Sequence, residues 1–161
     1  MPWDIVQPVV MPAIIRALCG RPYPGHPRGC PNVGHKAGCP PTAPMLDALI
    51  DLSRPVWAVW TTFPLAEHMA RLAAAHPAWT DRQLRCVLYW QPAARKALRE
   101  VVGEFLRKSW DRLTIHIAVC PEANGCNLTE TMKTASRGPI ILQWPPMDLA
   151  YQIVLAGIRK E

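Results

Sequence analysis

The stretch GHPRGCPNVGHKAGCPP, from Gly25 to Pro41, decides where helix and strand cannot form in this chain. Prolines and glycines recur throughout it, so its backbone lacks donors and favours turns. Cys30 and Cys39 in this stretch are followed directly by proline, as is Cys120 much further along the chain. A following proline pushes a cysteine towards an extended backbone, which helps to aim thiolates at a shared centre. The stretch therefore predicts a loop that a bound metal organises.

The length of 161 residues predicts a single domain spanning 1–161, with a cysteine-rich metal loop at 19–44 and a core at 45–161. A core of this size needs no disulfides, so the six cysteines favour metal binding, catalysis or burial in a reducing compartment. The apolar N-terminus carries Asp4 and several prolines, which is unlike a signal peptide. No apolar run approaches the length of a membrane span. We therefore expect a cytoplasmic protein without a membrane partner.

The net charge of +6 and the pI near 9.2 would suit an acidic partner such as nucleic acid. Basic residues are concentrated in one region, at Arg95, Lys96, Arg99, Arg107, Lys108 and Arg112. However, Glu100 and Glu104 are spaced one helical turn from Lys96 and Lys108 respectively, which predicts ion pairs along a solvated helix face. The charge pattern therefore favours an ordinary helix surface over a nucleic-acid interface.

Apolar periodicity predicts helices over residues 44–52, 65–76 and 81–105, and from about 128 to 136. Thr80 is a suitable N-cap for the longest of them, and Pro92 should kink or divide it. Asn127 or Thr129 should begin the last one, and Gly138 should follow its end.

Strands are predicted over residues 56–63, 113–119, 140–143 and 149–158. The first is β-branched and aromatic at both odd and even positions, which is typical of a strand covered on both faces. The helical segments that follow it predict parallel neighbours joined by a right-handed crossover. We expect an α/β fold, or alternatively α+β, with a small mixed sheet of about four strands, helices packed on it and an irregular Cys/Pro/Gly-rich loop.

Cys30 and Cys39 are the best candidate metal ligands, because the glycines and prolines between them let the chain fold back on itself. Cys120 is the third candidate, since it follows a predicted strand and begins the turn CPEANGC. The fourth ligand is Cys19 at the loop entrance, Cys126 or a histidine. Cys126 is alternatively a reactive thiolate, because a helix N-terminus lowers the pKa of a thiol.

Histidines offer a second ligand set, a small tetrahedral zinc site formed by His26, Cys30, His35 and Cys39. His116 alternates with isoleucines in a predicted strand, and a structural role suits it better than a site role. His68 and His76 are expected on helix surfaces. Cys86, within the longest predicted helix, is expected to be buried and inert.

The run GCPNVGHKAGCPP resembles the cysteine motif of bacterial and archaeal proteins described as predicted metal-binding proteins, a family of unknown function. The resemblance rests on residues Cys30, Pro31, Gly34, Cys39, Pro40 and Pro41. Residues 120–128 add weaker support. Pro27 and Val33 depart from the family pattern, at positions where a cysteine and an aromatic residue are usual. The resemblance implies a cysteine-bound metal, such as an iron–sulfur cluster, in a small α/β domain.

Among cofactors, the sequence favours an iron–sulfur cluster of the 4Fe–4S type over zinc, because the candidate ligands are mostly thiolates. Ligation by Cys30, Cys39 and Cys120 alone would leave one iron open to a small molecule or a redox partner. Redox chemistry and the removal of sulfur or hydroxyl groups are therefore both expected activities. The alternative is a zinc-stabilised module whose basic helix contacts RNA or a protein.

Overall fold

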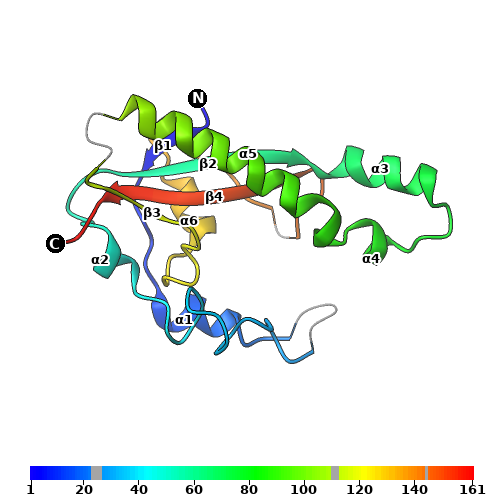
Figure 1. Cartoon of the computed structure of the whole chain (residues 1–161), viewed down its shortest axis with the longest axis horizontal. Helices are drawn as coiled ribbons and strands as arrows, with labels where there is room; N and C mark the ends of the chain where they lie inside the picture. Colours follow the sequence, from blue (N-terminus) through cyan, green and yellow to red (C-terminus); the bar gives the residue numbers. More distant parts are fainter. Residues whose placement is uncertain (23–26, 110–112, 144) are drawn as a thin grey trace. The chain divides into compact units, whose positions relative to one another are not determined.

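The computed structural model describes residues 1–22, 27–109, 113–143 and 145–161 (Figure 1). Four strands form one sheet in the order β1-β2-β4-β3. They are β1 (Trp3–Val6), β2 (Val56–Pro64), β3 (Ile115–Ala118) and β4 (Leu149–Ile158). The predicted mixed α/β fold with a four-stranded sheet is confirmed. The short N-terminal strand β1 was not predicted.

The sheet is antiparallel, so the predicted parallel neighbours are wrong. The chain passes from β2 through three helices to β3, but β4 lies between these two strands. β3 pairs with β4 alone, with Ile115 opposite Ile158 and Ala118 opposite Leu155. β3 was expected beside β2, but β4, the last strand in the sequence, takes that place.

Six helices accompany the sheet in the described part of the chain. They are α1 (Pro12–Leu18), α2 (Leu46–Leu49), α3 (Leu65–Ala75), α4 (Asp81–Leu84), α5 (Val87–Lys108) and α6 (Leu128–Lys133). The predicted N-caps at Thr80 and Asn127 are confirmed, because each side chain accepts a hydrogen bond from a backbone N–H three residues later. None of the helices in the described ranges is long and apolar enough to cross a membrane.

Two local predictions need correction. The longest predicted helix is divided between α4 and α5, where Cys86 has a non-helical backbone, while Pro92 lies inside α5. The predicted strand over residues 140–143 is absent. Its Ile140 N–H donates to the carbonyl of Met132 at the end of α6, so this segment closes a turn after the helix instead of pairing with the sheet.

The chain divides into two compact units, and the boundary crosses both β2 and β4. Unit 1 contains residues 1–2, 59–109 and 142–153. Its core is formed by Leu65, Trp90, Ala94 and Ala150, with Phe63 stacked on Trp90 at a ring separation of 5.4 Å. His68 packs edge-on against Phe63 and is only 8% exposed, so the expectation that it lies on a helix surface is wrong. His76 is exposed, as predicted.

Unit 2 contains residues 3–58, 110–141 and 154–161. Its largest fully buried side chains include Leu46, Ile50, Met132 and Leu155. The carboxylate of Asp4 joins β1 to the segment after α6, accepting from Ser136 Oγ at 2.6 Å and from the Arg137 N–H at 2.8 Å. These hydrogen bonds outweigh burial and lower the pKa of Asp4 below its usual value. Unit 2 also contains the cysteine-rich loop and five of the six cysteines, all except Cys86.

Candidate metal centre

The cysteine loop begins where α1 ends, and Cys19 is the C-cap of that helix. The Cys19 carbonyl accepts a hydrogen bond from the Cys30 N–H at 2.8 Å, so the two cysteines are neighbours across the loop. The two backbone segments that contain Gly20 and Gly29 lie very close together there. A Cβ on Gly29 would lie 2.7 Å from the backbone of Gly20, and Gly29 has a φ of 79°, so only glycine fits.

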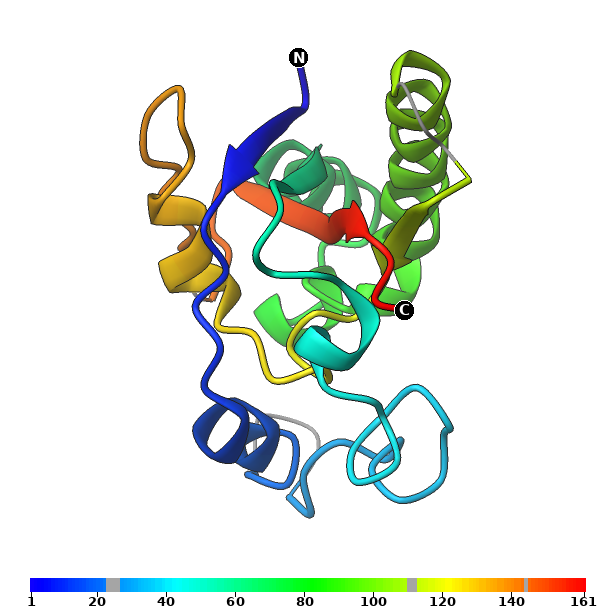
Figure 2. The same ribbon diagram turned by 90° about the vertical axis from the view of Figure 1, so that its left-hand side faces the viewer.

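The far side of the loop is fastened to the same helix. Arg16 of α1 donates to the carbonyl of Pro41 at 2.7 Å and lies 2.9 Å from the sulfur of Met45. Cys39 belongs to the turn before Pro41, where its N–H donates to the carbonyl of Lys36 at 2.9 Å. Figures 1 and 2 both show α1 (dark blue) and the loop (light blue to cyan) side by side. Cys19, Cys30 and Cys39 are therefore carried by one joined structure.

The charges of Cys30 and Cys39 affect the pKa of Cys19. Burial raises the pKa of the Cys19 thiol, and the negative charges of Cys30 and Cys39 raise it further. Glu122 acts in the same direction, while the guanidinium of Arg16 opposes them with the smallest effect. Deprotonation of Cys19 would therefore add a negative charge near Cys30, Cys39 and Glu122, and Arg16 would partly compensate it.

The turn that carries Cys120 is hydrogen-bonded to the residue before α1 and to the C-terminal end of the loop. The Met11 N–H, just before α1, donates to the carbonyl of Gly125 at 2.8 Å. The Leu46 N–H donates to the carbonyl of Asn124 at 3.0 Å, and Asn124 Nδ2 donates to the carbonyl of Pro44 at 2.8 Å. Cys120 itself is exposed at the start of this turn. The turn is therefore bonded to the segment before α1 and to the C-terminal end of the loop, and a shared site with the loop cysteines stays a prediction.

Glu122 is a candidate that the sequence analysis missed. Burial raises the pKa of its carboxyl group, although the side chain reaches the surface, because protein atoms surround it densely. Its charge in turn raises the pKa values of Cys19 and Cys126. The available signal was its place directly after Cys120-Pro121, since a carboxylate is also a metal ligand.

Cys126 is not a reactive thiolate. It is fully buried, its sulfur lies 3.3 Å from Thr131 Oγ1, and burial raises its pKa to about 11. The cost of burying a charge therefore exceeds any stabilisation from the N-terminus of the short helix α6. Cys86, which was expected to be buried and inert, is only half-buried and precedes α5 in unit 1.

The histidines contribute little to this site. His35 is exposed on the loop, and His26 lies outside the described residues. His116 lies opposite Gly157 in the sheet, and burial lowers its pKa, with a further lowering by Arg159. The predicted zinc site of His26, Cys30, His35 and Cys39 stays a prediction, because His26 lies outside the described residues.

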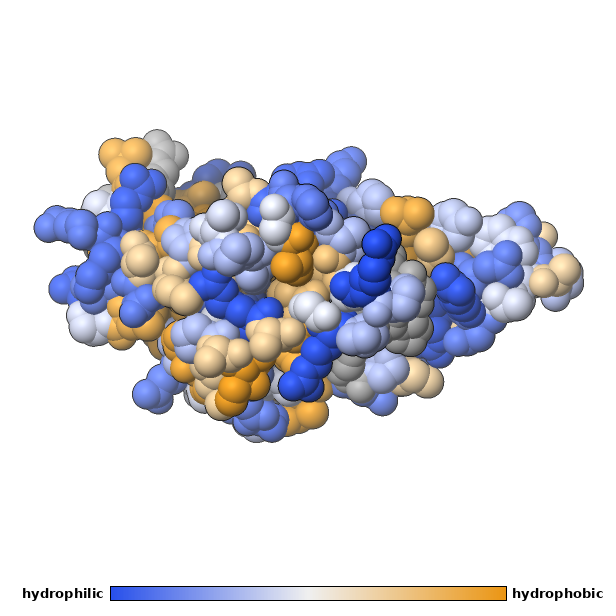
Figure 3. All heavy atoms as spheres, turned by 90° about the horizontal axis from the view of Figure 1, so that it is seen from below, coloured by the Kyte–Doolittle hydropathy of each residue, from blue (hydrophilic) through white to orange (hydrophobic). Residues whose placement is uncertain are grey.

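The surface around the loop is partly apolar. Figure 3 views the molecule from the side of α1 in Figure 1 and shows apolar surface (orange) among hydrophilic surface (blue). The exposed apolar side chains of α1 and its flanks are Met11, Ile14, Leu18 and Met45. Leu18 and Met45, just outside the two ends of the cysteine loop, therefore add exposed apolar surface beside it.

The candidate ligand side chains are not gathered around one point in this structure. Among the residues that the structure describes, no three histidine, cysteine, aspartate or glutamate side chains lie close enough together to hold a metal ion. A shared centre for Cys19, Cys30, Cys39 and Cys120 stays a prediction. Comparison with protein families, with curated proteins and with solved structures finds no match for this chain.

Proposed function

We propose that the protein binds a metal centre through Cys19, Cys30 and Cys39, with Cys120 as the fourth ligand. The observation that carries the proposal is the closeness of Cys19 and Cys30, whose backbones share a 2.8 Å hydrogen bond at the loop entrance. In agreement with it, burial raises the pKa of the Cys19 thiol, and the charges of Cys30 and Cys39 raise it further. A group of this kind is stabilised by a cation that binds the thiolates and removes their protons.

Arg16, whose charge lowers the pKa of Cys19, already bonds the Pro41 carbonyl and contacts Met45 through its guanidinium. Metal ions of the soft type prefer thiolates, and iron–sulfur clusters and zinc are the common choices. The donor chemistry therefore fits a metal, and Glu122 is an additional oxygen donor beside it.

The loop can close on a metal without refolding. Its backbone is already joined to α1 at both sides, through the Cys30–Cys19 hydrogen bond and through Arg16 and Pro41. Changes of cysteine side-chain rotamer, with a small shift of the turn at Cys39, are the movements that metal binding would then require. This mode of assembly is usual for metal sites, because the ligands repel one another until the metal is present.

An iron–sulfur cluster is the favoured centre, because four thiolates drawn from distant segments are its usual ligands. Such a cluster would supply electron transfer or, with one thiolate absent, an open iron that binds a small molecule. A zinc centre held by the same cysteines is the alternative and would make the loop a structural element.

The test is metal analysis and absorption spectroscopy of the full-length protein purified without oxygen. We expect a brown protein with about four irons per chain. Cys30→Ala and Cys39→Ala should each abolish metal retention, because a short loop that loses one thiolate no longer forms the site.

Cys86→Ala is the matched control and should retain the metal, because Cys86 lies in unit 1, outside the loop. A colourless protein with one zinc would favour the structural alternative. Full metal content in Cys30→Ala, or no metal in the original protein after anaerobic purification, would contradict the proposal.

A further inference from the structure

A stack of three aromatic rings lies on the surface of unit 1, far along the chain from the cysteine loop. Trp79 stacks on His76 with a ring separation of 4.0 Å and an interplanar angle of 9°. It also stacks on Tyr89 with a separation of 5.3 Å and an angle of 22°. His76 and Tyr89, at the two ends of the stack, are exposed, and Tyr89 is 52% exposed.

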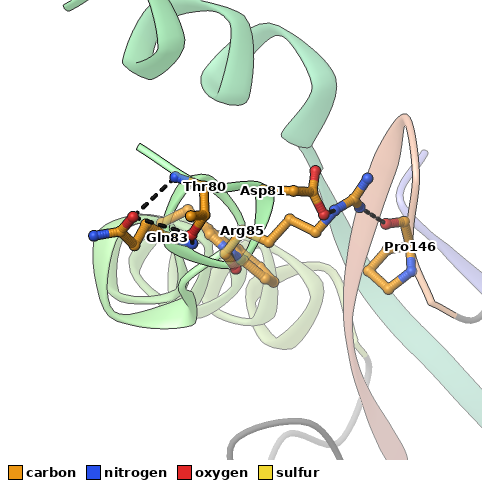
Figure 4. A network of polar contacts seen from close by, with 6 residues as sticks. Thr80, Asp81, Gln83, Arg85 and Pro146 are labelled. Carbon is orange, nitrogen blue, oxygen red and sulfur yellow. Dashed lines mark hydrogen bonds and ion pairs between the residues drawn. The ribbon is translucent and has the colours of Figure 1, made fainter. Parts of the chain in front are cut away.

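The segment that presents these rings is held in place. Figure 4 shows Thr80 and Gln83 in a capping box at the start of α4, and Arg85 between Asp81 and the carbonyl of Pro146. The Trp79 N–H donates to the carbonyl of His76 at 2.9 Å. The stack is therefore a fixed feature of unit 1 instead of three independent side chains.

Basic residues continue from the stack along α5. Leu88, Arg95 and Arg99 recur at helical spacing and share one stripe of the helix, and Tyr89 and Lys96 share the neighbouring stripe. These residues are all exposed. Arg99 lies about 15 Å along the helix axis from Tyr89 at the usual rise of an α-helix.

These charges differ from the others in the region. Arg85 is bonded to Asp81 and Pro146, and Lys108 is paired with Glu104 at 2.7 Å, as the sequence predicted. Within the described ranges, no ion pair involves Arg95, Lys96 or Arg99, so the predicted pairing of Lys96 with Glu100 is wrong. Thus the stripe nearest the aromatic rings keeps its positive charge for a ligand.

We infer that this surface of unit 1 binds single-stranded nucleic acid, with a base stacking on Tyr89 and phosphates contacting Arg95, Lys96 and Arg99. Exposed flat rings bind unpaired bases of any sequence, and basic side chains beside them contact the phosphates. A purely apolar protein partner would leave the basic stripe unused. The inference is independent of the proposed metal centre, which belongs to unit 2.

The test measures fluorescence anisotropy of a short labelled single-stranded RNA, and of the matching DNA, over a series of salt concentrations. Tyr89→Ala should weaken binding roughly 5- to 150-fold, the usual range for loss of one stacked base, while Tyr89→Phe should bind normally. Arg95→Gln with Arg99→Gln should reduce the salt slope by about 1.4, because two phosphate contacts are lost.

The matched control removes two charges elsewhere, by Arg21→Gln with Arg54→Gln in unit 2, and should leave the slope unchanged. Chelated protein should bind as well as the metal-loaded form, which separates this inference from the proposed function. Absence of binding, an equal effect of the control, or no effect of Tyr89→Ala would overturn the inference. So would sedimentation showing a dimer that Leu88→Lys dissociates and no affinity for the oligonucleotide.

Discussion

The cysteine loop, described at residues 19–22 and 27–44, and the turn over residues 120–126 look alike in sequence but differ in the structure. Both combine Cys-Pro steps with glycines at positive φ, namely Gly29 and Gly34 in the loop and Gly125 in the turn. In the turn, residues 123–126 are all buried, whereas most of the described loop is exposed. The turn is bonded to distant parts of unit 2, and the loop is bonded mainly to itself and to α1.

This contrast shows that Cys-Pro and glycine mark a bent backbone without revealing what stabilises it. Burial of apolar side chains and satisfied carbonyls stabilise the turn. The loop has too few buried side chains for that, so a metal is the stabilising component that we propose. Four experiments test the distinction.

The largest effect should appear in limited proteolysis. Removal of metal by a chelator should make the cysteine loop, residues 19–44, sensitive to proteinase K, because its remaining bonds are local. The turn over residues 120–126 should stay uncut, since the core of unit 2 covers it. Mass spectrometry of the fragments locates the cuts. A loop that resists the protease equally with and without chelator would contradict a metal-organised loop.

A pair of glycine substitutions should separate the two segments next. Gly125→Ala places a Cβ 2.9 Å from Pro12 at a φ of 87°, and strain plus overpacking should lower the free energy of unfolding by about 3 kcal/mol. Gly34 has a φ of 75° but nothing within 4 Å of the added atom, so Gly34→Ala should lower it by about 1 kcal/mol. Urea denaturation measures both. Equal losses would mean that the turn is no more closely packed than the loop.

Cysteine alkylation should show a comparable contrast in the metal-free protein. Burial raises the pKa of Cys126 from 9.0 to about 11, so its thiolate fraction at pH 8 falls about 100-fold, and burial further excludes the reagent. Exposed Cys120 should react with iodoacetamide far faster. Peptide mass spectrometry at increasing times gives the two rates. Reaction of Cys126 at a rate near that of Cys120 would show that the turn opens frequently.

The smallest effect should come from two asparagines. Asn124→Ala removes the 2.8 Å bond to the Pro44 carbonyl from a residue that is 6% exposed, which should cost about 1–2 kcal/mol of unfolding free energy. Asn32→Ala, at an exposed position in the loop, should change it by less than about 0.5 kcal/mol. Thermal or urea denaturation of the two variants provides the comparison, and a larger loss at Asn32 would reverse it.

Much of the regular structure was predictable because it depends on local sequence. The strand over residues 149–158 was predicted at its observed bounds, and the N-caps at Thr80 and Asn127 follow from the chemistry of their own side chains. The position of β4 between β2 and β3 could not be predicted. Strand order depends on which apolar faces pack together at long range, and the crossover rule concerns only neighbouring strands.

The cysteines show the same division. The sequence by itself determined that residues around Cys30 and Cys39 form an irregular loop, because proline and glycine restrict the backbone wherever they occur. Only the tertiary structure decided that Cys126 is a buried thiol, that Glu122 lies beside Cys19 and that His68 belongs to a core. Burial and pKa depend on the atoms that distant segments place around a side chain, and local sequence does not specify them.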